Sequence, residues 1–122
     1  MPKTPKVRKV RPLAGVLEHI ISAIAEIESF TKGMALPQFL EDKKTTRAVE
    51  RCLEIISEAS RDIPAGIKSK HPAIDWRGMA DAGNLYRHGY EHVNPDLVWK
   101  TIINDLPSLK ALATEMSDSG AD

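Results

Sequence analysis

The sequence lacks most of the features that would place a protein outside the cytoplasm. Its one cysteine, Cys52, excludes an intramolecular disulfide bond and is typical of a reducing compartment. No apolar run approaches the roughly 20 residues that a helix needs to cross a bilayer. The N-terminus has no apolar segment behind its charged residues, so it does not have the form of a secretory signal. Together these absences predict a cytoplasmic protein.

The chain also lacks a net formal charge at pH 7. The 17 basic and 17 acidic residues balance, which excludes a general electrostatic attraction to nucleic acid or to a membrane. The basic residues are nevertheless unevenly placed, because residues 1–11 contain no acid and five bases: Lys3, Lys6, Arg8, Lys9 and Arg11. We interpret residues 1–11 as a flexible basic tail. An arm that contacts RNA or an acidic face of a partner is the alternative.

The sequence shows no strand-like alternation, internal repeat or low-complexity segment. Its apolar residues recur at steps of three and four, as on one face of a helix. Asp75 and Asn94, the latter followed by Pro95, are typical residues at a helix start. We therefore expect helices over about 12–31, 38–63, from Asp75 through the stretch that follows, and 94–116. These helices predict an antiparallel four-helix up-and-down bundle over residues 12–116, followed by a frayed C-terminus at 117–122.

The apolar stripes also predict which side chains form the core. The expected core residues are Leu13, Leu17, Ile20, Ile24 and Ile27, then Val49, Cys52, Ile56, Ala59 and Ile63, and finally Val98, Ile102, Asp105 or Leu106, Leu109 and Leu112. Cys52 is thus expected to be a buried small apolar residue and not a nucleophile. Glu50 is expected on a solvated face, while Glu58 points to a partner or to the bundle centre. Residues 63–74 are expected to form a loop, and Pro107 to kink the last helix.

Most of the usable chemistry lies between Trp76 and Tyr90. His88 can exchange a proton near neutral pH, and Asn84 and Arg87 are its near neighbours on a helix. Such a group can act on a phosphodiester: histidine moves the proton, arginine neutralises charge at phosphorus and asparagine orients a group. The alternative is an ordinary polar helix face with Tyr86 or Tyr90 packed below it. His88 and His92 have the spacing of two metal ligands, but no third ligand completes a known pattern.

Four stretches resemble the HepT family of HEPN-domain proteins, the toxin halves of HEPN/MNT toxin–antitoxin pairs. They are AVERCLEIISEAS at 48–60, HPAIDWRGMA at 71–80, the NxxxHGY pattern at 84–90 and VNPDLVWKTIINDLPSLK at 93–110. The resemblance covers about residues 12–116. It implies an all-α HEPN bundle that forms a homodimer, in which the motif helices of two subunits line a shared cleft. It also implies metal-independent RNA cleavage that needs no cofactor.

The family motif is an arginine, four to six residues, a histidine, and often a tyrosine two places on. By this resemblance His88 is the catalytic histidine, Asn84 matches the polar residue after the arginine, and Tyr90 matches the tyrosine. The partner in such pairs is a small nucleotidyltransferase antitoxin of the MNT type, which is thought to attach AMP to that tyrosine. Tyr90 is therefore the expected AMP acceptor. The added negative charge would repel RNA phosphate.

The sequence departs from the motif at the arginine. Gly83 stands at its expected place, and the positions that other spacings would use hold Asp81 and Ala82. Losing a cation at a developing phosphate charge can cost several kcal/mol of barrier stabilisation. Arg87 lies about 100° round the helix from His88 and is the candidate substitute, whereas Arg77 lies farther away.

Three hypotheses remain open. The chain is an endoribonuclease with a degenerate motif, an inactive HEPN binding module that still pairs with a nucleotidyltransferase, or a purely structural helical bundle. Gly83 favours the binding module, and the intact His88 and Tyr90 favour the enzyme.

Overall fold

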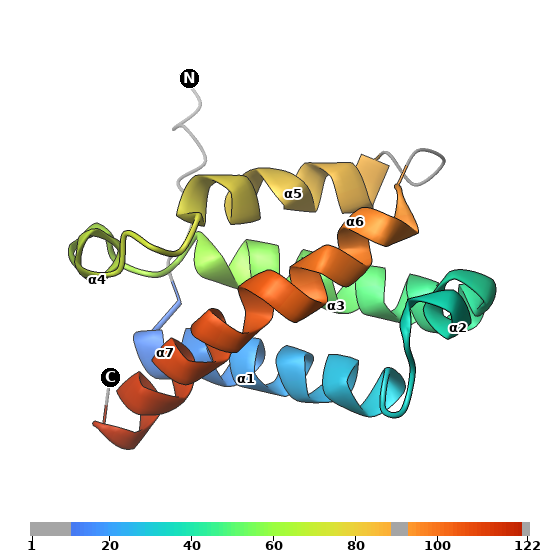
Figure 1. The fold of residues 1–122 in the computed structure, drawn as a ribbon. Helices are drawn as coiled ribbons and strands as arrows, with labels where there is room; N and C mark the ends of the chain where they lie inside the picture. The colour runs from blue at the N-terminus through green and yellow to red at the C-terminus, as the bar shows by residue number, and fades with distance from the viewer. Residues whose placement is uncertain (1–10, 89–92, 121–122) are drawn as a thin grey trace, which may run out of the picture.

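The computed structural model describes residues 11–88 and 93–120, and all regular elements in these two ranges are helical (Figure 1). The long helices are α1 (Leu13–Phe30), α3 (Lys43–Ser60), α5 (Trp76–His88) and α7 (Leu106–Asp118). Short ones are α2 (Leu36–Glu41), α4 (Ala65–Lys70) and α6 (Pro95–Lys100), and a π-helical turn, η1 (Thr101–Asp105), joins α6 to α7. The all-helical, bundle-like fold confirms the predicted class. No helix in the described part is long and apolar enough to cross a membrane.

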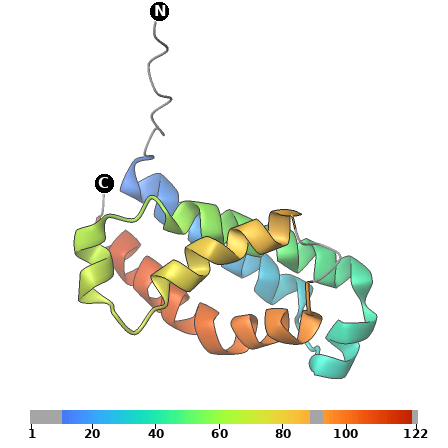
Figure 2. The same ribbon diagram turned by 90° about the horizontal axis from the view of Figure 1, so that it is seen from above.

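The middle position belongs to α3, which packs against α1 on one side and α5 on the other. The run from α6 through η1 to α7 crosses these helices, and α7 packs on α1 (Figures 1 and 2). Successive long helices run in opposite directions (Figure 1). The cluster predicted to carry the chemistry therefore lies on an outer helix of the bundle.

The core is formed by the predicted apolar stripes. The expected core positions are buried except Leu13 and Ile102, which are partly buried and pack against the buried cluster. At the position left open between Asp105 and Leu106, Leu106 is the buried residue and Asp105 is exposed. The sequence analysis did not identify Phe39, which α2 buries completely and which lies against Trp99 with ring centroids 5.1 Å apart. Phe39 connects the short α2 to α6, so the core extends beyond the four long helices.

The prediction of one helix over 38–63 was wrong, because the chain breaks at Asp42 into α2 and α3. The Asp42 carboxylate accepts a hydrogen bond from the backbone N–H of Thr45 at 3.0 Å and another from its hydroxyl at 2.8 Å. An aspartate that bonds the backbone two or three residues on begins a helix, and the periodicity of apolar residues does not show this.

Two further predictions were wrong in the same region. Residues 63–74 are not only loop, because α4 forms a surface helix of six residues after Pro64, whose φ of −59° suits a helix start. Glu50 is not solvated: it is only 6% exposed, and Arg47 donates to it at 3.1 Å. Since α3 is packed from two sides, its buried face is wider than the narrow apolar stripe and includes Glu50 and Ser57.

The helix predicted from Asn94 begins as expected, since the Asn94 side chain accepts from the backbone N–H of Asp96 at 2.9 Å and Pro95 follows it. The disturbance expected at Pro107 takes the form of η1, which lies directly before it. A proline ring collides with the carbonyl group four residues earlier in a regular α-helix. The wider π turn accommodates the ring, so the chain continues directly into α7.

Candidate functional site

The start of α5 is fixed by a cap and by a hydrogen bond to the preceding loop. The backbone N–H of Gly78 donates to the Asp75 carboxylate at 3.0 Å, and the Trp76 indole donates to the carbonyl of His71, also at 3.0 Å. A Cβ atom at position 78 would collide with the Asp75 carboxylate. With the Asp75 carboxylate in this position, glycine is the residue that fits at position 78. The hydrogen bond from Gly78 confirms Asp75 as the N-cap.

The middle of α5 is held against α3 by two donors that share one acceptor. The Ser57 hydroxyl and the Arg61 guanidinium each lie 3.0 Å from the Ala80 carbonyl oxygen. Gly83, less than one turn farther on, is buried. The position where the family arginine is expected thus faces the interior of the bundle, while the neighbouring Asn84 is exposed.

The predicted site residues gather at the C-terminal end of α5. Asn84 is exposed on its last turns, and Arg87 and His88 are the last two residues of the helix. The side chains of Arg87 and His88, and the whole of Tyr90 and His92, lie outside the described part of the structure. The structure therefore places the backbone of Asn84, Arg87 and His88 on one helix, as predicted, and leaves the role of their side chains as a prediction.

Arg77 is separated from this group. Its side chain is 94% exposed and lies 4.0 Å from the Asp81 carboxylate. Eleven residues of α-helix separate it from His88, which corresponds to about 16 Å along the helix axis. Arg77 is therefore poorly placed to replace the missing arginine, in contrast to Arg87.

Tyr86 packs below the polar face, as the alternative interpretation expected. It is half-buried, and desolvation raises the pKa of its phenol above the usual value, while a hydrogen bond with Thr101 opposes the shift. Tyr86 therefore stays protonated at neutral pH and can donate a hydrogen bond. It contributes to a cavity that the sequence analysis did not identify.

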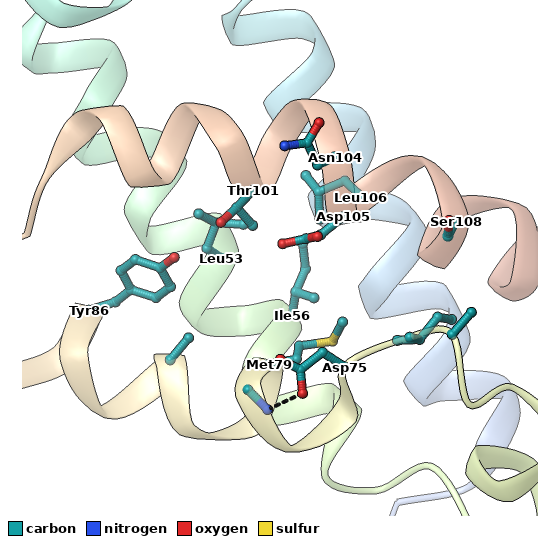
Figure 3. Close-up of a pocket in the computed structure, with 14 residues that line it drawn as sticks. Leu53, Ile56, Asp75, Met79, Tyr86, Thr101, Asn104, Asp105, Leu106 and Ser108 are labelled. Atoms are coloured by element: carbon teal, nitrogen blue, oxygen red, sulfur yellow. Dashed lines mark hydrogen bonds between the residues drawn. The ribbon is translucent and has the colours of Figure 1, made fainter.

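This cavity has a volume of about 270 Å³ and lies between α3, α5, η1 and the residues before α5 (Figure 3). Its apolar wall includes Leu53, Ile56 and Met79. Tyr86 points toward it from α5, and Thr101 and Asp105 point toward it from η1 (Figure 3). No sequence pattern identifies it, because its walls come from segments far apart in the chain. The proline after η1 is the one local signal that the helix is irregular there.

Asp105 has an unusual environment for an acid on a helix surface. Desolvation raises the pKa of its carboxyl group, and the nearby charge of Asp75 raises it further. No cation forms an ion pair with Asp105 among the described residues. The same part of the chain contains no cluster of three or more His, Cys, Asp or Glu residues arranged to hold a metal ion.

Comparison with known proteins identifies relatives of the whole bundle. The family described as HepT-like, "Ribonuclease HepT-like", matches residues 20–116. A protein of Thermococcus cleftensis named "Probable ribonuclease HepT" is 49% identical over 94 residues, which are 77% of this chain and 86% of that protein. A Methanocaldococcus jannaschii protein named "Putative RNase MJ0127" is 37% identical over 75% of this chain and 76% of its own length. No solved structure gives a significant match.

Proposed function

This chain belongs to the HepT-like ribonuclease family, and from that membership we propose that it is a metal-independent endoribonuclease. The observation that supports the proposal most directly is the placement of Asn84, Arg87 and His88 at one end of α5, with Asn84 exposed. The substrate is RNA in the cytoplasm.

The proposed chemistry uses the ribose 2′-hydroxyl as the nucleophile. That oxygen attacks the adjacent phosphorus, the bond to the 5′-oxygen of the next nucleotide breaks, and a 2′,3′-cyclic phosphate is left. The 2′-hydroxyl loses a proton and the leaving 5′-oxygen gains one, so the step is balanced overall. His88 carries one of these two transfers and water the other, because an imidazole group can give or take a proton near neutral pH. Arg87 neutralises the charge that grows on the phosphate oxygens, and Asn84 positions the phosphate.

Gly83 stands where the family motif has an arginine. Its burial bears on which other residue can supply a cation to the phosphate. An arginine at this position would have to bring a guanidinium into the interface between α5 and α3, where an unpaired charge is costly. Arg87 lies on the same helix, next to His88, and is the cation that we assign to the phosphate. Gly83 is also the observation that favours the second candidate function, an inactive HEPN module that binds a nucleotidyltransferase.

The test is cleavage of an end-labelled RNA by the purified chain in excess EDTA. We expect His88→Ala and Arg87→Ala each to lower the rate at least about 100-fold, as for loss of a general acid–base group or of a charge-stabilising group. Arg77→Ala removes an exposed arginine from the same helix and is the matched control, for which the rate should stay unchanged. Full cleavage by His88→Ala would exclude this site. A folded chain free of modification at Tyr90 that cleaves no RNA would support the binding module.

The proposed assembly is a homodimer that pairs with an MNT-type nucleotidyltransferase antitoxin, which transfers AMP to Tyr90. Tyr90 lies two residues after His88, so an adenylate there adds negative charge beside the proposed phosphate site. Incubation with the cognate transferase and ATP should increase the mass of the chain by one or more AMP units, and Tyr90→Phe should prevent this. An unchanged adduct on Tyr90→Phe would show that another residue is the acceptor.

A further inference from the structure

We propose that residues 1–10 are an RNA-binding arm, which holds the substrate by its phosphates and brings it to the C-terminal end of α5. The proposal rests on the ribonuclease function, because it names the segment that binds the same substrate. The residues of the arm lie outside the described part of the structure. Its root, Arg11, lies within that part, and so does the surface that the arm would serve.

The charge of the chain is divided between the arm and the rest. Residues 1–10 carry four of the 17 basic residues, Lys3, Lys6, Arg8 and Lys9, and none of the 17 acidic ones. The remaining residues therefore include four more acids than bases. A body with a net negative charge repels RNA phosphates, whereas a segment with only positive charges attracts them. The zero net charge of the chain is thus the sum of two parts of opposite sign.

The surface around α5 has no excess of positive charge that could hold RNA. Between residues 75 and 105, four carboxylates and two cations are exposed among the side chains that the structure describes. They are Asp75, Asp81, Asp96 and Asp105, and Arg77 and Lys100. The proposed role of Arg87 is to neutralise charge at one phosphate, so the flanking nucleotides need cations from elsewhere. The arm is the segment of the chain that has them without neighbouring acids.

The root of the arm is fixed to the bundle. The Nε atom of Arg11 donates to the Asp62 carboxylate at 2.9 Å, and the Asp62 side chain is only 1% exposed. The Nη1 atom of Arg11 lies 2.6 Å from Nδ1 of His19 on α1. Hydrogen bonds between ionised groups are among the stronger ones in proteins. Arg11 is therefore committed to the fold, and Lys9 is the first base that can contact RNA.

The root lies within reach of the proposed phosphate site. Asp62 directly follows Arg61, which donates to the Ala80 carbonyl on α5, and α1 begins at the end of the bundle where α5 begins (Figures 1 and 2). From Ala80 to His88 the helix rises about 12 Å. Ten residues of extended chain span up to about 33 Å. More than half of that length is left for the sideways distance from Arg11 to α5.

The acidic groove beside the root is a less favourable place for the arm than RNA. Arg11 and Glu54 line the same groove between α1 and α3, and Glu54 already forms an ion pair with Arg51. Asp62 likewise pairs with Arg11. A lysine from the arm would compete with these existing pairs, whereas on RNA it would release only condensed counterions.

The experiment measures binding of a fluorescein-labelled, single-stranded 2′-O-methyl RNA to the full chain by fluorescence anisotropy at several salt concentrations. The methyl group removes the nucleophile of the proposed reaction, so binding is observed without cleavage. Each phosphate neutralised on a single strand contributes about 0.7 to the slope of the logarithm of the association constant against that of the salt concentration. The double variant Lys6→Gln/Lys9→Gln should therefore reduce this slope by about 1.4 and weaken binding about 25-fold at about 0.1 M salt.

The matched control removes the same charge outside the arm. Lys32→Gln/Lys70→Gln changes two exposed lysines and should bind with the slope and affinity of the unaltered chain. Both double variants should melt at the temperature of the unaltered chain. In cleavage of unmodified RNA, the arm variant should raise KM and leave kcat unchanged, because the arm binds substrate and transition state equally.

An unchanged salt slope in the arm variant, or an equal loss of affinity in the control, would overturn the proposal. A lower melting temperature of the arm variant with unaltered RNA binding would also overturn it and would assign the arm to the chain's own acidic surface. Displacement of the RNA by polyglutamate at equal charge concentration would assign it to an acidic protein partner. Cleavage with an unaltered KM in the arm variant would reject the arm but keep the ribonuclease, and arm-dependent RNA binding without cleavage would do the reverse.

Discussion

The thiol of Cys52 is buried and lies beside a carboxylate, and both features raise its pKa. The side chain is 2% exposed, and its thiol donates to the Glu26 carboxylate at 3.4 Å. Burial, and then the hydrogen bond and charge of Glu26, raise the pKa of the thiol from 9.0 to about 11. Since the thiolate is the reactive form, the thiol should be inert in the folded protein.

We predict that Cys52 reacts with a disulfide reagent such as DTNB at pH 8 at least about 100-fold more slowly in the folded chain than in urea. The two pKa values differ by about two units, which lowers the thiolate fraction about 100-fold, and burial limits access further. The absorbance of the released thiolate measures the rate. Equal rates with and without denaturant would show that the thiol is accessible and ionised.

Individual residues also show where sequence reasoning reached its limit. The burial of Cys52 and the place of Asn84 on a polar helix face follow from helical periodicity, so both could be predicted. The burial of Glu50 could not be predicted, and the pattern did not decide between Asp105 and Leu106 for the inner position, because the environment of each depends on a helix that is distant in the sequence or on an irregular turn. For these residues the decisive interaction is tertiary, and a one-dimensional pattern does not contain it.

Among the helices, the break between α2 and α3 depends on a single side chain. The Asp42 carboxylate accepts hydrogen bonds from both the backbone N–H and the hydroxyl of Thr45. Both bonds lower the pKa of Asp42 below 3.8, and the bond from the backbone N–H has the larger effect. A carboxyl group whose pKa is lowered on folding stabilises the folded state above its unfolded pKa. That contribution is lost as the pH falls through the lower, folded value.

We predict that Asp42→Ala lowers the melting temperature at pH 7 and that this difference shrinks below pH 3.8 as Asp42 becomes protonated. Thermal unfolding followed by circular dichroism, once at pH 7 and once below pH 3.8, measures both effects. Asp118→Ala is the control: its carboxylate lies at the C-terminal end of α7, where the helix dipole disfavours negative charge, so no loss is expected. A constant difference at both pH values would contradict the cap.

The helices themselves were more predictable than their interruptions. The starts of α5 and α6 carry cap residues that can be read in sequence, Asp75 and Asn94, and both form the expected bonds. Asp42 is also a typical cap residue, but it lies inside a longer amphipathic pattern that predicts one continuous helix. The π turn was visible only through Pro107, which predicts a disturbance without specifying its form.

For the whole molecule, the position of α5 at one side of the bundle leaves part of this helix without a neighbour among residues 11–88 and 93–120. One face of α5 packs on α3, and its other side exposes Leu85 and Asn84, with Leu85 44% exposed. A single exposed apolar residue is common on protein surfaces, so the reason to test Leu85 is its position beside the proposed catalytic group. We propose that two such helices meet in the homodimer that the family resemblance led us to expect.

We predict that Leu85→Lys weakens self-association of the chain by about thirtyfold or more, the loss typical of a central apolar contact. Placing a lysine on each of two facing helices adds like-charge repulsion to the loss of apolar burial. Sedimentation equilibrium measures the dissociation constant of the dimer. Leu40→Lys, which changes a leucine of similar exposure on α2, should leave the dissociation constant unaltered.

The same pair of variants tests whether the cleft is shared between subunits. If residues of both subunits form one site, the cleavage rate of Leu85→Lys should depend on protein concentration and recover when the dimer is restored at high concentration. Leu40→Lys should cleave RNA at the rate of the unaltered chain throughout. A monomeric Leu85→Lys that retains full cleavage at low concentration would show that one α5 helix suffices, and that dimerisation is separate from the chemistry.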